Sequence, residues 1–186
     1  KGEEQLEKIL SIDRLNHFAR LEKYLWNSAE PVKKNFLSLV RNELPHETFL
    51  ELATWYRELD QNDDAFMVLS MAPETAEVLY WLAFLKRNST EGEILLQKAI
   101  TASPLLSFPF REASVPVLEW AIQKDRGWKP KYYLGLIYWH KNNLAKATDL
   151  FGQCGTEPDF APFYAGRANL VDEKKTEQKI ADLKHA

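Results

Sequence analysis

Residues 133–158 read YLGLIYWHKNNLAKATDLFGQCGTEP, and this stretch decides the fold. Two small residues, Gly135 and Ala147, are each followed three or four positions later by a large one, Tyr138 and Phe151. Residues at this separation share one face of a helix. The pattern therefore predicts two helices that approach closely at their small residues and fill the space beside them with the large ones.

The stretch ELATWYRELDQNDDAFMVLSMA at 51–72 has the same spacing. One constant offset of 82 positions (135 − 53) matches small residues with small ones and large with large. The matched pairs are Ala53 with Gly135, Tyr56 with Tyr138, Ala65 with Ala147, Leu69 with Phe151, and Ala72 with Cys154. Such self-similarity is the sequence signature of a repeat protein.

A third, shortened copy follows Ala83, with Gly92, Leu96 and Ala99 in the later positions. Each of them comes three residues earlier than in the other copies, which predicts a shorter turn around 87–90. Each helix pair of such an array leaves an apolar face that the next pair covers.

Helical periodicity continues outside these copies, with weaker repeat spacing. We expect further helices at about 17–27, 31–43, 116–124, 162–170 and 173–184. Pro109 and Pro116 interrupt the stretch 105–127, which predicts an irregular segment before the helix that starts near Pro116. In that helix we expect the inward residues to be Leu118, Ala121 and Ile122. The final helix is mostly charged, as is typical of the cap of a repeat array.

The order of small and large residues around Leu134-Gly135 resembles the tetratricopeptide repeat, although Pro158 falls one residue early. This resemblance implies an all-α fold, a right-handed α-solenoid of antiparallel helix pairs. Phrases such as RNELPHETFLELATWY and WKPKYYLGLIYW also resemble the C-terminal repeat region of large Bacteroidetes-type proteins. In those proteins a β-rich domain, similar to sugar-handling β-sandwich domains, precedes the repeats.

We expect one repeat domain over residues 1–186 rather than separate domains. Its predicted segments are 1–14 (partial), 15–45, 46–79, 80–104, 105–127 (irregular), 128–161 and 162–186 with the capping helix.

Composition argues against several classes of protein. The net charge is -3 and no Lys/Arg stripe is present, so a nucleic-acid partner is not expected. Apolar stretches such as 78–85 are too short to span a bilayer, so a membrane partner is not expected either. The single Cys154 allows no intrachain disulfide, and the cytoplasm is the favoured compartment.

The titratable residues do not form a recognisable catalytic or metal-binding motif. No pair has metal-ligand spacing among the four histidines, His17, His46, His140 and His185. We expect Cys154 to be a buried packing residue, and Asp63 or Asp64 to cap a helix that begins near Ala65. We therefore expect no enzyme activity, no metal and no cofactor.

In tetratricopeptide arrays the first helix of each pair lines a concave groove. By resemblance, the groove residues here are Leu50, Thr54, Arg57, Tyr80, Phe84, Arg87, Tyr132, Leu136, Trp139 and His140. Chaperone-binding members hold a carboxylate with Lys and Asn at places where this chain has Leu50, Thr54, Tyr132 and Leu136. We therefore do not expect chaperone-tail binding. We expect the tryptophans at 55, 81 and 120 to lie in the core.

The resemblance implies a protein-protein interaction scaffold that binds a peptide or partner domain in its groove. One alternative is a module that packs on, or dimerises, a neighbouring sugar-handling-like domain of the same chain. A less favoured alternative is a glycan-binding helical module, because exposed aromatic rings stack on sugars.

Overall fold

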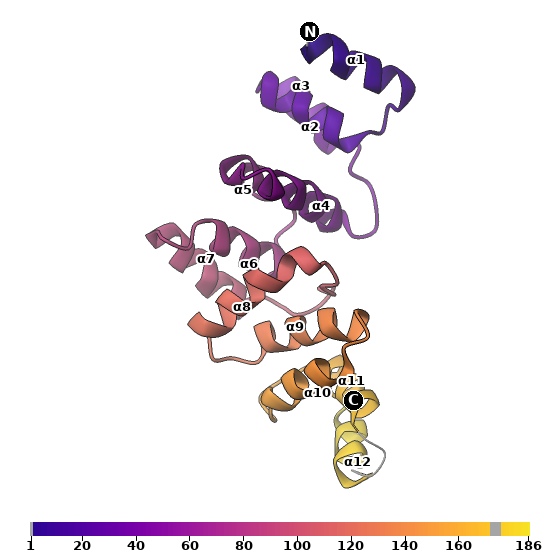
Figure 1. Cartoon of the computed structure of the whole chain (residues 1–186), viewed down its shortest axis with the longest axis vertical. Coiled ribbons are helices and arrows are strands. Elements are labelled where there is room, and N and C mark those ends of the chain that lie inside the picture. The colour runs from indigo at the N-terminus through magenta and orange to yellow at the C-terminus, as the bar shows by residue number, and fades with distance from the viewer. Residues whose placement is uncertain (1, 172–175) are drawn as a thin grey trace. The chain divides into compact units, whose positions relative to one another are not determined.

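The computed structural model describes residues 2–171 and 176–186, and every regular element in that part of the chain is helical. It contains twelve α-helices and one short 3-10 helix (Figure 1). The all-α prediction is confirmed. The chain divides into two compact units, Lys1–Pro73 and Glu74–Ala186.

The first unit holds five helices in two packed groups. They are α1 (Gly2–Ile12), α2 (His17–Trp26), α3 (Glu30–Leu37), α4 (Pro45–Glu58) and α5 (Asn62–Leu69). Helix α2 packs on α1 and on α3, and α4 packs on α5. The helix predicted to reach residue 43 ends at Leu37, and α4 begins with Pro45 in its first turn, where proline is tolerated.

The second unit holds the remaining helices. They are α6 (Ala76–Leu85), α7 (Thr90–Thr101), η1 (Glu112–Ser114), α8 (Val115–Lys124), α9 (Lys129–His140), α10 (Leu144–Gln153), α11 (Ala161–Leu170) and α12 (Thr176–His185). The start of the predicted final helix, 173–175, lies outside the described residues. Helix α6 begins at Ala76, capped by the Thr75 hydroxyl, so the repeat boundary predicted at 79/80 lies inside this helix.

Short connections join the helices of each hairpin, so the two partners run in opposite directions. Figure 1 shows α6 beside α7, and close packing also joins α9 to α10 and α11 to α12. The large residues of the pattern are buried at the matched places Leu69, Leu96 and Phe151. The small residues are buried too, as at Ala65 and Ala147.

Two glycines show why the pattern demands small residues. A Cβ on Gly135 of α9 would lie 2.7 Å from the Phe151 ring of α10. A Cβ on Gly92 of α7 would lie 2.1 Å from the carbonyl oxygen of Lys86. The shorter turn of the third hairpin brings this backbone so close that Gly92 replaces the alanine of the other copies.

Candidate functional site

Three of the predicted groove residues are core residues. Leu50, Tyr80 and Tyr132 are at most 3% exposed, so they present almost no surface to a partner. The Tyr132 ring lies edge-on against Phe151 and Phe163, with ring centroids 5.4 and 5.7 Å apart. Tyr80 lies edge-on to Tyr133 of α9 at 6.3 Å. An aromatic cluster between α9, α10 and α11 accounts for the burial of Tyr132, and the groove prediction is corrected at all three positions.

Two other predicted groove residues, Phe84 near the end of α6 and Arg87 just after it, belong to a partly exposed cluster. Phe84 is half-buried, and the exposed Arg87 holds its guanidinium 4.4 Å from the centroid of the Phe84 ring. Trp120 of α8 lies edge-on to the same ring at 5.7 Å. Trp120 was predicted to lie in the core but is half-buried, whereas Trp81 is fully buried as predicted.

The predicted residues on α9 lie toward the end of that helix. Leu136 and Trp139 are half-buried, and His140 is exposed. Trp139 packs edge-on against Phe151 at 6.0 Å and reaches α11, where a Cβ on Gly166 would lie 3.4 Å from its ring. The same Cβ would lie 3.0 Å from the Phe151 ring, so the absence of a side chain at Gly166 leaves room for Phe151 next to Trp139.

The predicted groove residues on α4 belong to the first unit. Thr54 and Arg57 are half-buried, as Leu136 and Trp139 are. Trp55, predicted to lie in the core, is 42% exposed and lies edge-on to Phe18 of α2 at 5.1 Å.

A surface that the repeat pattern did not predict lies in the connection between α7 and η1. Residues 102–111 read ASPLLSFPFR and form no helix; η1 begins at the next residue, Glu112. Four large apolar side chains of this loop are between 42 and 64% exposed, namely Leu105, Leu106, Phe108 and Phe110. We call these four residues the loop patch.

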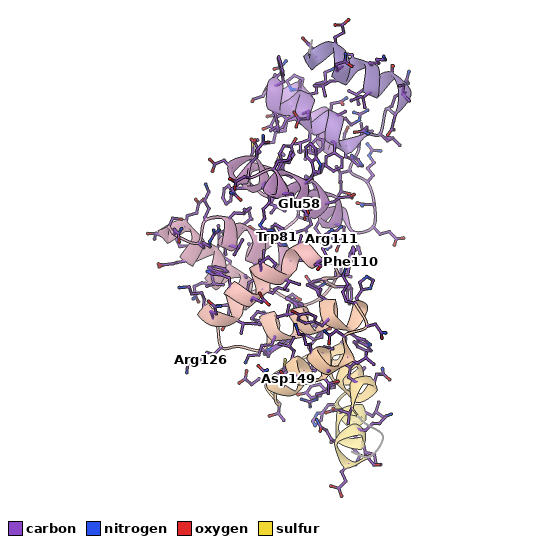
Figure 2. All side chains as sticks on the ribbon, viewed as in Figure 1. Glu58, Trp81, Phe110, Arg111, Arg126 and Asp149 are labelled. Atoms are coloured by element: carbon purple, nitrogen blue, oxygen red, sulfur yellow. The ribbon has the colours of Figure 1, made fainter. Side chains whose placement is uncertain are left out.

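The loop patch adjoins the end of the predicted groove helix. The Phe110 ring lies edge-on to the His140 ring at 5.9 Å, so one exposed α9 residue and the patch are in contact. Figure 2 labels Phe110 beside Arg111, whose guanidinium lies 4.5 Å from the centroid of the Phe110 ring. Lys141 then pairs with Glu112 at 3.1 Å, which ties the end of α9 to η1.

Polar anchors hold both ends of this loop. Before the loop, the Lys129 ammonium donates to the carbonyls of Ile100 and Ala102 at the C-terminal end of α7, and burial lowers the pKa of this lysine. Cationic donors are favourable at that end of a helix. These hydrogen bonds therefore hold the backbone at the start of the loop in place.

After the loop, Ser114 is fully buried. Its hydroxyl donates to Glu77 Oε1 at 2.9 Å and accepts from Trp81 Nε1 at 2.9 Å. Figure 2 labels Trp81 close to this part of the fold. Burying a carboxylate is costly unless it is hydrogen-bonded, so this triad stabilises η1 against α6.

The remaining polar candidates have structural places. Cys154 is 1% exposed and donates to the carbonyl of Leu150 at 3.3 Å, and burial raises the pKa of its thiol to about 12. The α5 helix begins at Asn62, so the prediction that Asp63 or Asp64 caps it was wrong: both lie within its first turn. Their charges there favour the helix N-terminus.

Within the described residues, no group of three or more His, Cys, Asp or Glu side chains is arranged to hold a metal ion. None of the described helices is long and apolar enough to cross a bilayer. No protein-family model matches the chain, and no curated protein matches it.

Proposed function

We propose that this chain is a right-handed α-solenoid of the tetratricopeptide type that binds a protein partner and carries out no chemistry of its own. Support comes first from the hairpins. The backbone N–H of Gln61 donates to Tyr56 O at 2.9 Å, and the matched N–H of Asn143 donates to Tyr138 O at 2.8 Å. Two stretches 82 positions apart therefore end their first helix in the same way, as repeats do.

The exposed loop patch beside His140 is the observation that carries the binding role. Soluble proteins rarely expose contiguous apolar patches of several hundred Å², and such patches mark interaction sites. This one contacts His140, which follows the half-buried Trp139 in α9, and Trp, Tyr and Arg are enriched among residues that dominate binding. We expect the ligand to be a peptide segment or the surface of a partner domain.

Selection of short linear peptides on the whole chain tests this function. Peptides from a display library should bind the folded wild-type chain saturably, and Arg87→Ala or His140→Ala should weaken at least some of them by about tenfold, or 1.4 kcal/mol. Both side chains are exposed, so these variants should keep their fold. Lys98→Ala, which removes an exposed cation from α7, is the matched control. A folded chain from which no saturable peptide can be selected contradicts the proposal.

A further inference from the structure

We propose that the loop patch docks a short peptide in extended conformation, with apolar side chains at every second position, by backbone pairing along residues 107–110. This inference rests on the proposed binding function and names its site and the chemistry of its ligand.

Burial along the loop is the reverse of what hydrophobicity dictates. Ser107 and Pro109 point inward and are buried, whereas Leu106, Phe108 and Phe110 point outward. Side chains on alternating sides are the mark of an extended backbone, and Arg111 at the end of the segment has extended angles, φ -75° and ψ 131°. Phe108 and Phe110, 50 and 42% exposed, forgo part of the free energy that full burial of an aromatic side chain contributes. A partner that covers the outward face would bury these apolar side chains and gain the hydrophobic free energy of that burial.

The backbone conformation at Leu106 points the same way. Its φ is +58°, in the left-handed region that leucine rarely adopts. Backbone strain of this kind concentrates at ligand-binding segments. The left-handed conformation of Leu106 turns the chain, and the extended segment begins at the next residue. Its first two side chains are the buried Ser107 and the exposed Phe108.

The extended segment has backbone groups available for pairing. Among the hydrogen bonds of the described residues, none uses the N–H or C=O of Phe108 or Phe110. Alternate residues of an extended chain direct these groups toward the same edge. Pro109, which has no N–H, belongs to the opposite edge, as is usual for proline in an edge strand. The edge with Phe108 and Phe110 keeps two donors and two acceptors for an added strand.

The apolar area of the loop patch favours a peptide, rather than a second copy of the chain, as its ligand. With their exposed fractions, the four side chains present about 400 Å² of apolar surface. A stable protein–protein interface needs about 800 Å² from each partner. The patch is too small for a stable dimer by itself but matches a few alternating apolar side chains laid along one strand.

The ligand's backbone and side chains make separate contributions, and both are testable. Peptides selected on the wild-type chain should carry apolar residues at alternating positions. The double variant Phe108→Ser/Phe110→Ser should weaken the binding of these peptides at least tenfold. Leu106→Gly should weaken it too, and this second variant keeps the fold because glycine relieves the positive φ. Ile94→Ser removes an equally exposed apolar side chain from α7 and should leave the affinity unchanged. An N-methylated peptide, unable to donate along one edge, should also bind at least tenfold more weakly.

Several outcomes overturn the inference, and they separate it from the proposed function. Peptides that bind wild type and both loop variants equally place the binding site elsewhere, and the general binding role survives. Equal affinity of the N-methylated peptide excludes backbone pairing. Self-association of the wild-type chain that disappears in the double variant makes a second copy the occupant. If the folded wild-type chain binds no peptide at all, both proposals fail.

Discussion

Asp60 and Asn142 occupy the same place in two helical hairpins and share a left-handed backbone, with φ of 61° and 57°. They lie 82 positions apart (142 − 60), the offset that also matches Ala53 with Gly135. Each follows the end of a helix, α4 or α9, where a residue with positive φ ends the helix and lets the backbone satisfy its last carbonyls. The repeat therefore extends from the packing residues to the backbone of the turn.

Replacement of these turn residues should show the cost of their conformation. Asp60→Ala and Asn142→Ala should each lower the free energy of unfolding by about 1 kcal/mol, because alanine is strained at positive φ, whereas glycine at either place should not destabilise. Urea denaturation measures the difference. Gln61→Ala, next to Asp60 but at φ -93°, is the control. Equal stability of the alanine and glycine variants would contradict this account of the turn.

The shortened third hairpin should be intolerant of any side chain at Gly92. Gly92→Ala places a Cβ against the Lys86 backbone oxygen, and overpacking of this kind costs about 1–3 kcal/mol. Gly152→Ala in α10 is the matched control: nothing lies within 4 Å of its Cβ position, and alanine favours a helix by up to about 1 kcal/mol. Thermal unfolding of both variants should shift in opposite directions. A Gly92→Ala chain as stable as wild type would show that the two backbones are further apart.

Local patterns predicted most of the helices and the small–large packing pairs, because helix periodicity and close approach depend on neighbouring residues. The groove was predicted less well. Tyr80 and Tyr132 lie on the expected helices, but residues from elsewhere in the chain cover them. Tyr133 packs on Tyr80, and Phe151 and Phe163 pack on Tyr132. A position along a helix does not reveal whether a neighbouring segment covers it.

The loop patch was missed for a related reason. It has no helical period, and the proline at 109 indicated only an irregular segment. Which of its side chains point outward depends on anchors that come from elsewhere in the chain, namely Lys129 and the Glu77–Ser114 hydrogen bond. Four large apolar residues crowded around a proline were the signal present in the sequence.

The last helix should depend on one buried ion pair. Arg167 of α11 donates to both carboxylate oxygens of Asp182 in α12, at 2.9 and 2.6 Å, and both residues are at most 7% exposed. Removing one charge from such a pair costs about 3–5 kcal/mol, so Asp182→Asn should release α12. Faster amide exchange in α12 would show this. Asp149→Asn, on the exposed face of α10, should leave that exchange unchanged (Figure 2). Undiminished protection of α12 in Asp182→Asn would exclude this role.

The stability of the first unit should fall on mild acidification. Burial, with a smaller contribution from the Arg20 charge, lowers the pKa of His17 below 6.5, against the weaker opposing effects of Glu51 and Asp13. The folded state therefore binds fewer protons at His17 than the unfolded state, and stability is lost as the pH falls from 7 through 6.5 toward the folded-state pKa. His17→Gln should flatten this dependence in urea titrations at a series of pH values. An identical pH slope in wild type and His17→Gln would contradict it.

Amide hydrogen exchange of the whole chain, with and without a peptide selected on it, tests the central claim most directly. If the chain binds an extended peptide along its loop, the amides of Phe108 and Phe110 should exchange at least tenfold more slowly in the complex, while those of the exposed loop between α9 and α10 should not change. Unchanged exchange at Phe108 and Phe110 under saturating peptide would contradict the claim.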